Sequence, residues 1–195
     1  MKKHRLISIP IVVLSIFVLF YFDTRIWLAA SNLVSREPYY NITDFITDNG
    51  LFLFYTAFVI IFAYALIKKN RKLIRLVVAY IQTQLIFSIA LVRILKIIVG
   101  RARPGHDPEF TFFSFAFRHN SFPSGHSADA FVSGMFLFYL LKHSKYSACR
   151  YLPLIYALLI AISRVFIRSH YPSDVVAGMA IGILGAWFFI SRVND

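Results

Sequence analysis

The sequence predicts an all-α, polytopic membrane protein whose six transmembrane helices form one bundle. Hydrophobic residues make up 58% of its 195 residues and charged residues only 15%. The mean hydropathy of +0.66 is too high for a soluble domain of this size. The apolar residues gather in separate runs, several of them near the short end of the ~17 to 25 residues that cross a bilayer. Lys and Arg are concentrated in alternate connections between these runs, as expected for a membrane protein of fixed topology.

Six apolar runs are interpreted as spans, at residues 6–22, 51–67, 76–99, 124–141, 152–167 and 174–190. The first follows a basic amino tail, which is typical of a signal anchor or a cleaved signal peptide, and its length favours the anchor. Residues 23–50 are polar and predict an external loop, with a possible short helix capped by Asn41. Because no internal repeat or linker separates a second unit, residues 1–195 are expected to form a single domain.

The distribution of charge predicts the orientation of the bundle. The amino tail, the turn at 68–75, the segment 142–150 and the carboxyl tail together hold twelve Lys or Arg but only one acid, Asp195. The positive-inside rule therefore assigns both termini to the cytoplasm. Seven of the nine acidic residues then lie on the opposite side, with the stretches that carry candidate chemistry. The small size and minimal loops favour a bacterial inner membrane.

The net charge of +12 does not indicate nucleic-acid binding. The cations lie between apolar runs and have no interleaved polar face, so membrane topology explains them better. The single Cys149 excludes an internal disulfide and a cysteine-based metal cluster. A membrane bilayer is therefore the partner that the composition predicts.

The segment 163–174 places basic and acidic groups between two apolar runs. If its proline opens a helix, His170 lies just before that helix and Asp174 in its first turn, where the carboxylate could hold the imidazole. His170 is thus a candidate nucleophile or base. Arg164 and Arg168 share a helix face and could point at one anion, such as a phosphate. A positively charged helix end with a satisfied histidine is the alternative.

Two earlier stretches also suit an anion. Lys96 and Arg103 are two helical turns apart and nearly eclipsed if the helix continues. Further along, Ser124 can cap a helix and leave the backbone N–H groups of Gly125 and His126 free to bind an anion. His126 would then be placed to protonate a leaving oxygen. The alternative for the Lys and Arg side chains is that they extend to the lipid head groups.

Three motifs in these stretches resemble, in order and spacing, the signature of the type 2 phosphatidic acid phosphatase superfamily. They are Lys96-x6-Arg103-Pro104, Pro123-Ser124-Gly125-His126 and Ser163-Arg164-x5-His170-x3-Asp174. The resemblance implies hydrolysis of a phosphomonoester or diphosphate through a phosphohistidine, with no metal or other cofactor. It implies that His170 attacks phosphorus, Asp174 orients His170 and His126 protonates the leaving group. It also implies a cradle for the phosphate oxygens, formed by Lys96, Arg103, Ser124, Gly125 and Arg164.

The function expected from this resemblance is a lipid phosphatase at the non-cytoplasmic face of the membrane. Undecaprenyl diphosphate, phosphatidylglycerophosphate, phosphatidate and lipid A 1-phosphate are equally compatible substrates. A lipid phosphotransferase could use the same site. An anion transporter is the alternative of another class, although transporters tend to have broken helices and repeated halves. A zinc site of His126, His170 and Asp174 is disfavoured because the adjacent cations would repel the ion.

Three further features have structural interpretations. Asp129 is expected either to orient His126 or to form an ion pair with Arg93. Three arginines are interpreted as interfacial cations rather than head-group contacts, namely Arg101, Arg118 and Arg168. The six phenylalanines of residues 110–122 are interpreted as an interfacial aromatic belt, with guidance of an acyl or prenyl chain as the alternative.

Overall fold

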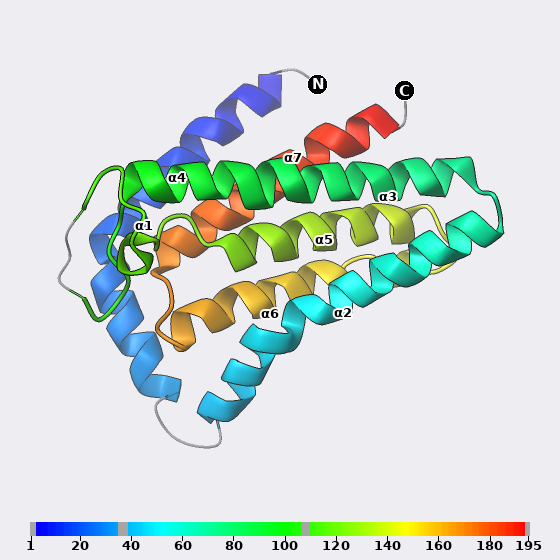
Figure 1. Ribbon diagram of the computed structural model, residues 1–195. Coiled ribbons are helices and arrows are strands. Elements are labelled where there is room, and N and C mark those ends of the chain that lie inside the picture. Colours follow the sequence, from blue (N-terminus) through cyan, green and yellow to red (C-terminus); the bar gives the residue numbers. More distant parts are fainter. Residues whose placement is uncertain (1–2, 35–38, 107–109, 194–195) are drawn as a thin grey trace.

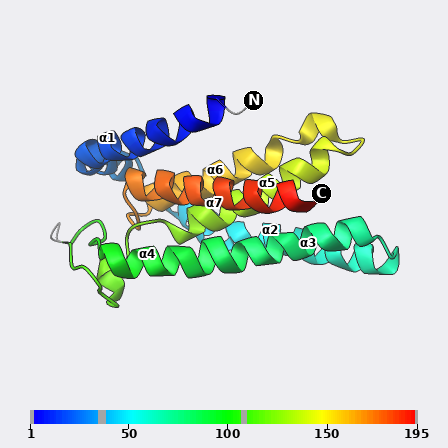
Figure 2. The same ribbon diagram turned by 90° about the horizontal axis from the view of Figure 1, so that it is seen from above.

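The computed structural model describes residues 3–34, 39–106 and 110–193. Six long helical segments make up this part of the chain (Figures 1 and 2). They are α1 (Lys3–Val34), α2 (Tyr39–Ile67), the continuous segment α3 (Arg71–Thr83), η1 (Gln84–Leu91) and α4 (Val92–Val99), then α5 (Gly125–Lys142), α6 (Leu152–Phe166) and α7 (Pro172–Val193). Two short 3-10 helices, η2 (Phe117–His119) and η3 (Ser147–Cys149), lie in the connections.

Four helices among the described residues are long and apolar enough to cross a membrane. These are Asn41–Ile67, Arg71–Val99, Ser147–Phe166 and Pro172–Val193. The protein is therefore an all-helical integral membrane protein. A helix lies at each of the six predicted span positions, but α1 and α5 are not among these four. The predicted number of six spans is thus not confirmed.

The third segment is one helix with a change of winding in its middle. Asn70 caps its start, because the side-chain oxygen accepts a hydrogen bond from the backbone N–H of Leu73 at 3.1 Å. The middle part, η1, is a π-helix, in which each turn takes in more residues than an α-helical turn. The helix ends at Gly100, whose φ of +55° is a left-handed conformation that glycine adopts without a Cβ penalty.

Where the structure describes residues 23–50, at 23–34 and 39–50, they are helical and do not form the external loop that their polarity predicted. α1 continues to Val34 and α2 begins at Tyr39, and Figure 1 shows both helices changing direction along their length. Some of the polar side chains here have partners inside the bundle. Thr47, for example, is fully buried and shares a 2.7 Å hydrogen bond with Ser163 of α6. Helix therefore persists where composition alone indicated solvent.

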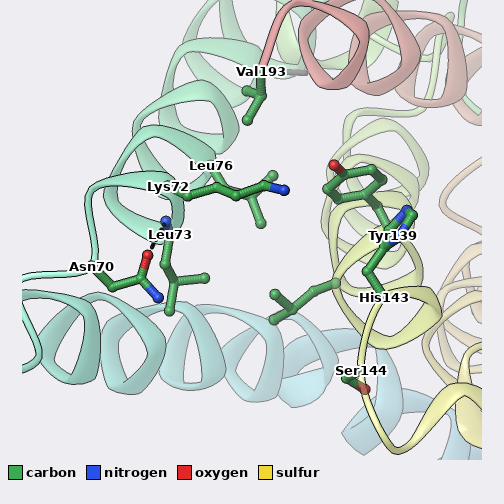
Figure 3. A pocket seen from close by; sticks show the side chains of 9 residues that line it. Asn70, Lys72, Leu73, Leu76, Tyr139, His143, Ser144 and Val193 are labelled. Carbon is green, nitrogen blue, oxygen red and sulfur yellow. Dashed lines mark hydrogen bonds between the residues drawn. The ribbon is translucent and has the colours of Figure 1, made fainter. Parts of the chain in front are cut away.

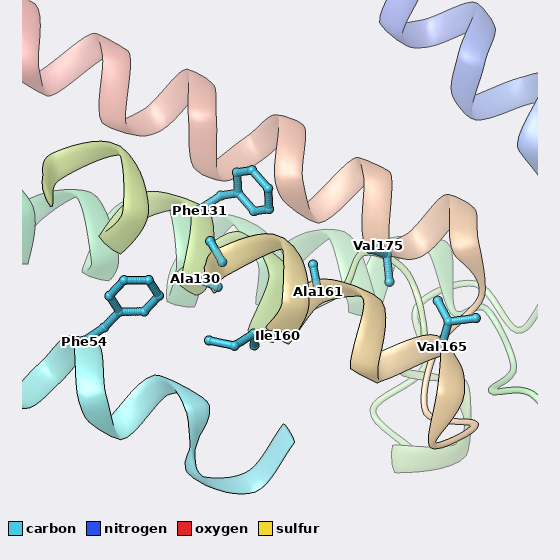
Figure 4. Close-up of a cluster of buried hydrophobic side chains, with 8 residues drawn as sticks. Phe54, Ala130, Phe131, Ile160, Ala161, Val165 and Val175 are labelled. Carbon is cyan, nitrogen blue, oxygen red and sulfur yellow. The ribbon is translucent and has the colours of Figure 1, made fainter. Parts of the chain in front are cut away.

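α5 packs against α6 and α7, and its contact with α7 is as close as two backbones allow. A Cβ on Gly178 would lie 2.3 Å from the carbonyl oxygen of Ser124, and a Cβ on Gly182 would lie 2.4 Å from that of Ala128. Small residues permit such close approach between membrane helices. A hydrophobic cluster from α2, α5, α6 and α7, with Phe54 and Ile160 among its members, also packs around α5 (Figure 4). Close backbone contact and apolar packing together fix the position of α5 relative to α7.

Candidate active site

The three predicted motifs meet at one end of the bundle. They come from the end of α4 and the loop after it, from the start of α5, and from the connection between α6 and α7 (Figure 1). Hydrogen bonds tie these segments together directly. The N–H of Ser124 donates to the carbonyl of Asp174 at 2.9 Å, and a guanidinium N–H of Arg103 donates to the carbonyl of Ser169 at 3.2 Å. Lys96 Nζ donates to the carbonyl of Asn120.

His170 lies beside a carboxylate that three donors hold in place. Its Nδ1 is 3.6 Å from Oδ2 of Asp174, an ion-pair distance that is longer than a hydrogen bond. The Asp174 carboxylate accepts from Arg101 at 2.6 Å, from the hydroxyl of Ser121 at 2.6 Å and from the backbone N–H of Tyr171 at 2.9 Å. Asp174 is fully buried and His170 is only 2% exposed.

The surroundings keep the imidazole neutral. Burial lowers the pKa of His170 to about 3, Asp174 opposes this shift and the cation of Lys96 adds to it. A neutral imidazole keeps a free lone pair for attack. With Nδ1 turned to Asp174, Nε2 is the nitrogen left for that attack.

The three cations of the motifs interact electrostatically with one another at this site, and none has a carboxylate partner among the described residues. Within the described residues, Lys96, Arg103 and Arg164 form no ion pair, and Nε of both arginines is buried without a hydrogen-bond acceptor. Buried donors without acceptors are costly, and a bound anion would supply the acceptors. Burial lowers the pKa of Arg103 while Asp174 opposes this, and a guanidinium stays charged at neutral pH. The arrangement suits a phosphoryl group.

The start of α5 supplies a further anion-binding feature. The prediction that Ser124 caps this helix is confirmed, since its side chain accepts from the N–H of Ser127 at 3.4 Å and from the Ser127 hydroxyl at 2.9 Å. The Ser124 hydroxyl is fully buried in this cap. Gly125 and His126 follow in the first turn, where backbone N–H groups and the helix dipole favour negative charge. His126 is half-buried.

Two predictions for charged residues were wrong. Arg101 is not an interfacial cation, because it is 7% exposed and forms ion pairs with Asp23 and Asp174. Asp129 bonds neither His126 nor Arg93 in the described structure. Its carboxylate accepts instead from the hydroxyl of Tyr55 and, at 2.6 Å, from the side chain of Gln84.

Sequence reasoning also missed Asp23, although one signal could have found it. An acidic residue at the end of an apolar run is costly unless it has a partner, so it marks a candidate polar site. Ser121 and Ser173, which bond the buried carboxylates, carry no such signal. The other predicted interfacial cations, Arg118 and Arg168, are exposed.

A cavity of about 270 Å³ lies at the far end of the bundle, away from the motifs. Lys72, Tyr139 and His143 line it, from the parts of α3 and α5 opposite the candidate site (Figure 3). It is therefore not the catalytic pocket. In the described residues there is also no group of three His, Cys, Asp or Glu side chains that could hold a metal ion.

The protein is thus an all-helical membrane protein that holds a buried imidazole, a fixed carboxylate and, among its described residues, cations without carboxylate partners at one end. This chemistry defines the class of membrane phosphoryl-transfer proteins. Residues 72–195 match the family model of the PAP2 superfamily. The chain belongs to this superfamily, which confirms the resemblance carried by the three motifs.

Known relatives agree with this assignment. The chain is 34% identical over 169 residues to a lipid A 1-phosphatase of Rhizobium johnstonii, over 77% of this chain and 65% of that protein. It is 35% identical over 109 residues to phosphatidylglycerophosphatase B of Bacillus subtilis, over 53% of this chain and 50% of that protein. The alignments thus span about half to two thirds of the length of these relatives.

Solved structures show the same fold. The crystal structure of a transmembrane PAP2 type phosphatidylglycerolphosphate phosphatase from Bacillus subtilis superimposes with a TM-score of 0.69 at 26% identity, covering 94% of both chains. The crystal structure of Aquifex aeolicus LpxE superimposes with a TM-score of 0.61 at 24% identity, covering 87% of this chain and 95% of that one. The helical arrangement is therefore that of PAP2 membrane phosphatases.

Proposed function

We propose that this protein is a membrane lipid phosphatase that hydrolyses a phosphomonoester or diphosphate of a lipid through a phosphohistidine. The observation that carries this proposal is the neutral imidazole of His170 beside the fixed Asp174 carboxylate, at a site whose three cations have no carboxylate partner in the part of the chain that the structure describes. Phosphoryl transfer depends mainly on positioning and on positive charge around the equatorial oxygens. Lys96, Arg103 and Arg164 supply that charge, so no metal ion is required.

The reaction runs in two steps. In the first, Nε2 of His170 attacks phosphorus, an N–P bond forms, and the P–O bond to the lipid or leaving phosphate breaks. His126 gives its proton to the departing oxygen, and Asp174 stabilises the positive charge that forms on the attacking ring. In the second, His126 takes a proton from water, the hydroxide attacks phosphorus, and the N–P bond breaks to release inorganic phosphate.

The cradle stabilises both transition states. Arg103 and Arg164 donate from their unpaired Nε atoms, and Lys96 adds a further charge. The N–H groups of the first turn of α5 complete the cradle, with Gly125 allowing close approach of an oxygen. Ser124 contributes by capping this turn, because its hydroxyl is engaged with Ser127.

The named relatives guide the choice of substrate. One is a lipid A 1-phosphatase and another a phosphatidylglycerophosphatase B, so a phosphomonoester on a lipid head group is the first class to test. Lipid A 1-phosphate should be tested first, because the lipid A 1-phosphatase aligns with a larger share of this chain than the phosphatidylglycerophosphatase B does.

The test is release of inorganic phosphate by purified protein from the four candidate lipids, without an added acceptor alcohol. Release without an acceptor supports a hydrolase, whereas release that requires one indicates a phosphotransferase. His170→Ala should abolish turnover in a folded protein, and His143→Ala, at the exposed far end of α5, is the matched control. Full activity of His170→Ala would refute the phosphohistidine.

We further infer that residues 1–195 work as one membrane domain in which α1 and α5 also span the bilayer. Both termini then lie in the cytoplasm and the catalytic end on the periplasmic side. The single Cys149 is exposed at the far end of the bundle. An impermeant maleimide should leave Cys149 unlabelled in intact cells and should label a cysteine that replaces the exposed Arg118. The reverse labelling pattern would overturn this orientation.

A further inference from the structure

Arg101 forms the centre of a buried chain of charges behind the catalytic histidine. One terminal nitrogen of its guanidinium donates to Asp174 Oδ1 at 2.6 Å and to the hydroxyl of Ser173 at 2.7 Å. The other terminal nitrogen donates to Asp23 Oδ2 at 2.8 Å. The side chains of Arg101, Asp23 and Asp174 are only 9%, 2% and 0% exposed. Such shielding from water strengthens each of these interactions.

Two aromatic rings also pack against the guanidinium. Its carbon lies 4.0 Å from the ring centroid of Phe20 and 4.2 Å from that of Tyr171. Cation–π contacts at these distances stabilise and orient an arginine. Phe20 belongs to α1, and Tyr171 is the residue next to His170. Arg101 therefore has one position, and it holds α1 against the catalytic segment.

The two carboxylate oxygens of Asp174 have different partners. Arg101 bonds Oδ1, whereas Oδ2 accepts from Ser121 and Tyr171 and faces Nδ1 of His170. By fixing Oδ1, the guanidinium sets the plane of the carboxylate. That plane determines how Oδ2 meets the imidazole.

Asp23 balances the charge of this arginine. If Arg101 had Asp174 as its one carboxylate partner, its full positive charge would weaken the stabilisation that Asp174 can offer to a positively charged His170. The second carboxylate offsets that charge. Asp23 also accepts from the backbone N–H of Ser173 at 2.9 Å and from its hydroxyl, in the first turn of α7. It therefore holds the helix that carries Asp174.

We propose that Asp23 and Arg101 are positioning residues of the active site, which orient Asp174 and preserve its negative charge for the phosphorylated state of His170. This inference rests on the proposed phosphatase activity. It extends the site to α1, which lies outside the residues 72–195 that match the family model. Among the described residues, the side chains of Asp23 and Arg101 form no hydrogen bond or ion pair with the residues of the phosphate cradle, so both are expected to act on the chemical step and not on substrate binding.

The experiment compares Asp23→Asn and Arg101→Lys with wild-type protein, using phosphate release in the steady state and formation of the phosphoenzyme in a single turnover. Asp23→Asn removes one charge from this chain. Arg101→Lys keeps the positive charge but loses the guanidinium fork whose two ends bond Asp174 and Asp23. Each substitution keeps the side chain's approximate size. We expect kcat and the rate of phosphoenzyme formation to fall roughly 10- to 100-fold, the range expected for a catalytic group displaced by up to about 1 Å. KM should stay within about twofold of wild type. The double variant should be no slower than the slower single variant, because the two residues act as one unit.

The control is Asp129→Asn, another carboxylate within a polar network, bonded by Tyr55 and Gln84 but without contact to Asp174. It should keep a kcat near that of wild type. Activities are compared per mole of monodisperse protein. The inference is tested as long as one of the two site variants folds. Wild-type kcat in a folded Asp23→Asn or Arg101→Lys variant, or multiplying losses in the double variant, would overturn the inference. A wild-type protein that releases no phosphate from any of the lipids would overturn the proposed function, and this inference with it.

Discussion

Replacing Gly178 by alanine puts a methyl group between α7 and the first turn of α5. The new Cβ would lie 2.3 Å from the carbonyl oxygen of Ser124, whereas ordinary contact begins at 3.4 Å. The obstacle is backbone, which cannot rotate away as a side chain could. The two helices must therefore separate locally by about 1 Å, the difference between these distances.

This separation acts directly on the candidate site. Asp174 lies one turn before Gly178 on α7, and the N–H of Ser124 donates to its carbonyl at 2.9 Å. Widening this contact moves His126 and the start of α5 away from His170. Since a displacement of 1 Å can cost roughly 100-fold in rate, kcat/KM should fall by about that factor, or about 2.7 kcal/mol in transition-state stabilisation.

Gly182→Ala is a matched control. Its Cβ would lie 2.4 Å from the carbonyl oxygen of Ala128, almost the same overlap, but one turn or roughly 6 Å further from the site. The assay is kcat/KM for phosphate release together with the midpoint of thermal unfolding in detergent. Both variants should lower the midpoint similarly, and Gly178→Ala should lose far more activity. Equal losses of activity, or none in Gly178→Ala, would refute the link between helix spacing and catalysis.

Three further predictions concern the metal, the pH and the aromatic loop. Phosphate release should resist EDTA and should not respond to added zinc, because the three cations supply the charge; restoration by zinc after chelation would contradict this. Burial lowers the pKa of His170 from 6.5 in the unfolded chain to about 3 in the folded protein. The free energy of unfolding should therefore decrease as the pH is lowered from 6.5 to 3, by at most about 1.4 kcal/mol per pH unit, and His170→Gln should remove that pH dependence from the unfolding midpoint. Phe112, Phe113 and Phe115 are 66%, 71% and 72% exposed, so their combined replacement by serine should raise KM for a long-chain substrate more than for a short one; equal effects would favour a simple aromatic belt.

The spacing of motifs predicted which residues meet at the site, because each motif is local. Lys96 lies in the last turn of α4 and Arg103 in the loop after Gly100, so the two do not share the continuing helix face that their spacing allowed. Ser124 caps a helix, and His170 and Asp174 flank a helix start. Short-range geometry of this kind follows from helical periodicity and capping alone. Hydropathy likewise located a helix at each predicted span, since it averages over many residues.

The errors have a common physical origin in partners that are distant in sequence. Arg101 was interpreted as an interfacial cation because its partner Asp23 is 78 residues away. Asp129 is satisfied by Tyr55, which is 74 residues away. Thr47 pairs with Ser163 across 116 residues, and the helix around it was taken for a loop. When polarity is counted residue by residue, a polar residue is predicted to be exposed to solvent. A polar group that has a hydrogen-bonding partner in the bundle can instead remain buried.

The π-helical stretch η1 has a consequence for the direction of Lys96. One more or one fewer residue turns everything beyond it by about 100° around the axis of the helix. Gln84 begins this stretch facing α5, and Lys96 follows beyond its end. Ordinary α-helical winding over the same 8 residues would turn the lysine to another side of the helix, away from the proposed phosphate cradle, while leaving every functional side chain in the sequence. The direction of the Lys96 side chain therefore depends on the winding of this stretch as well as on its residues.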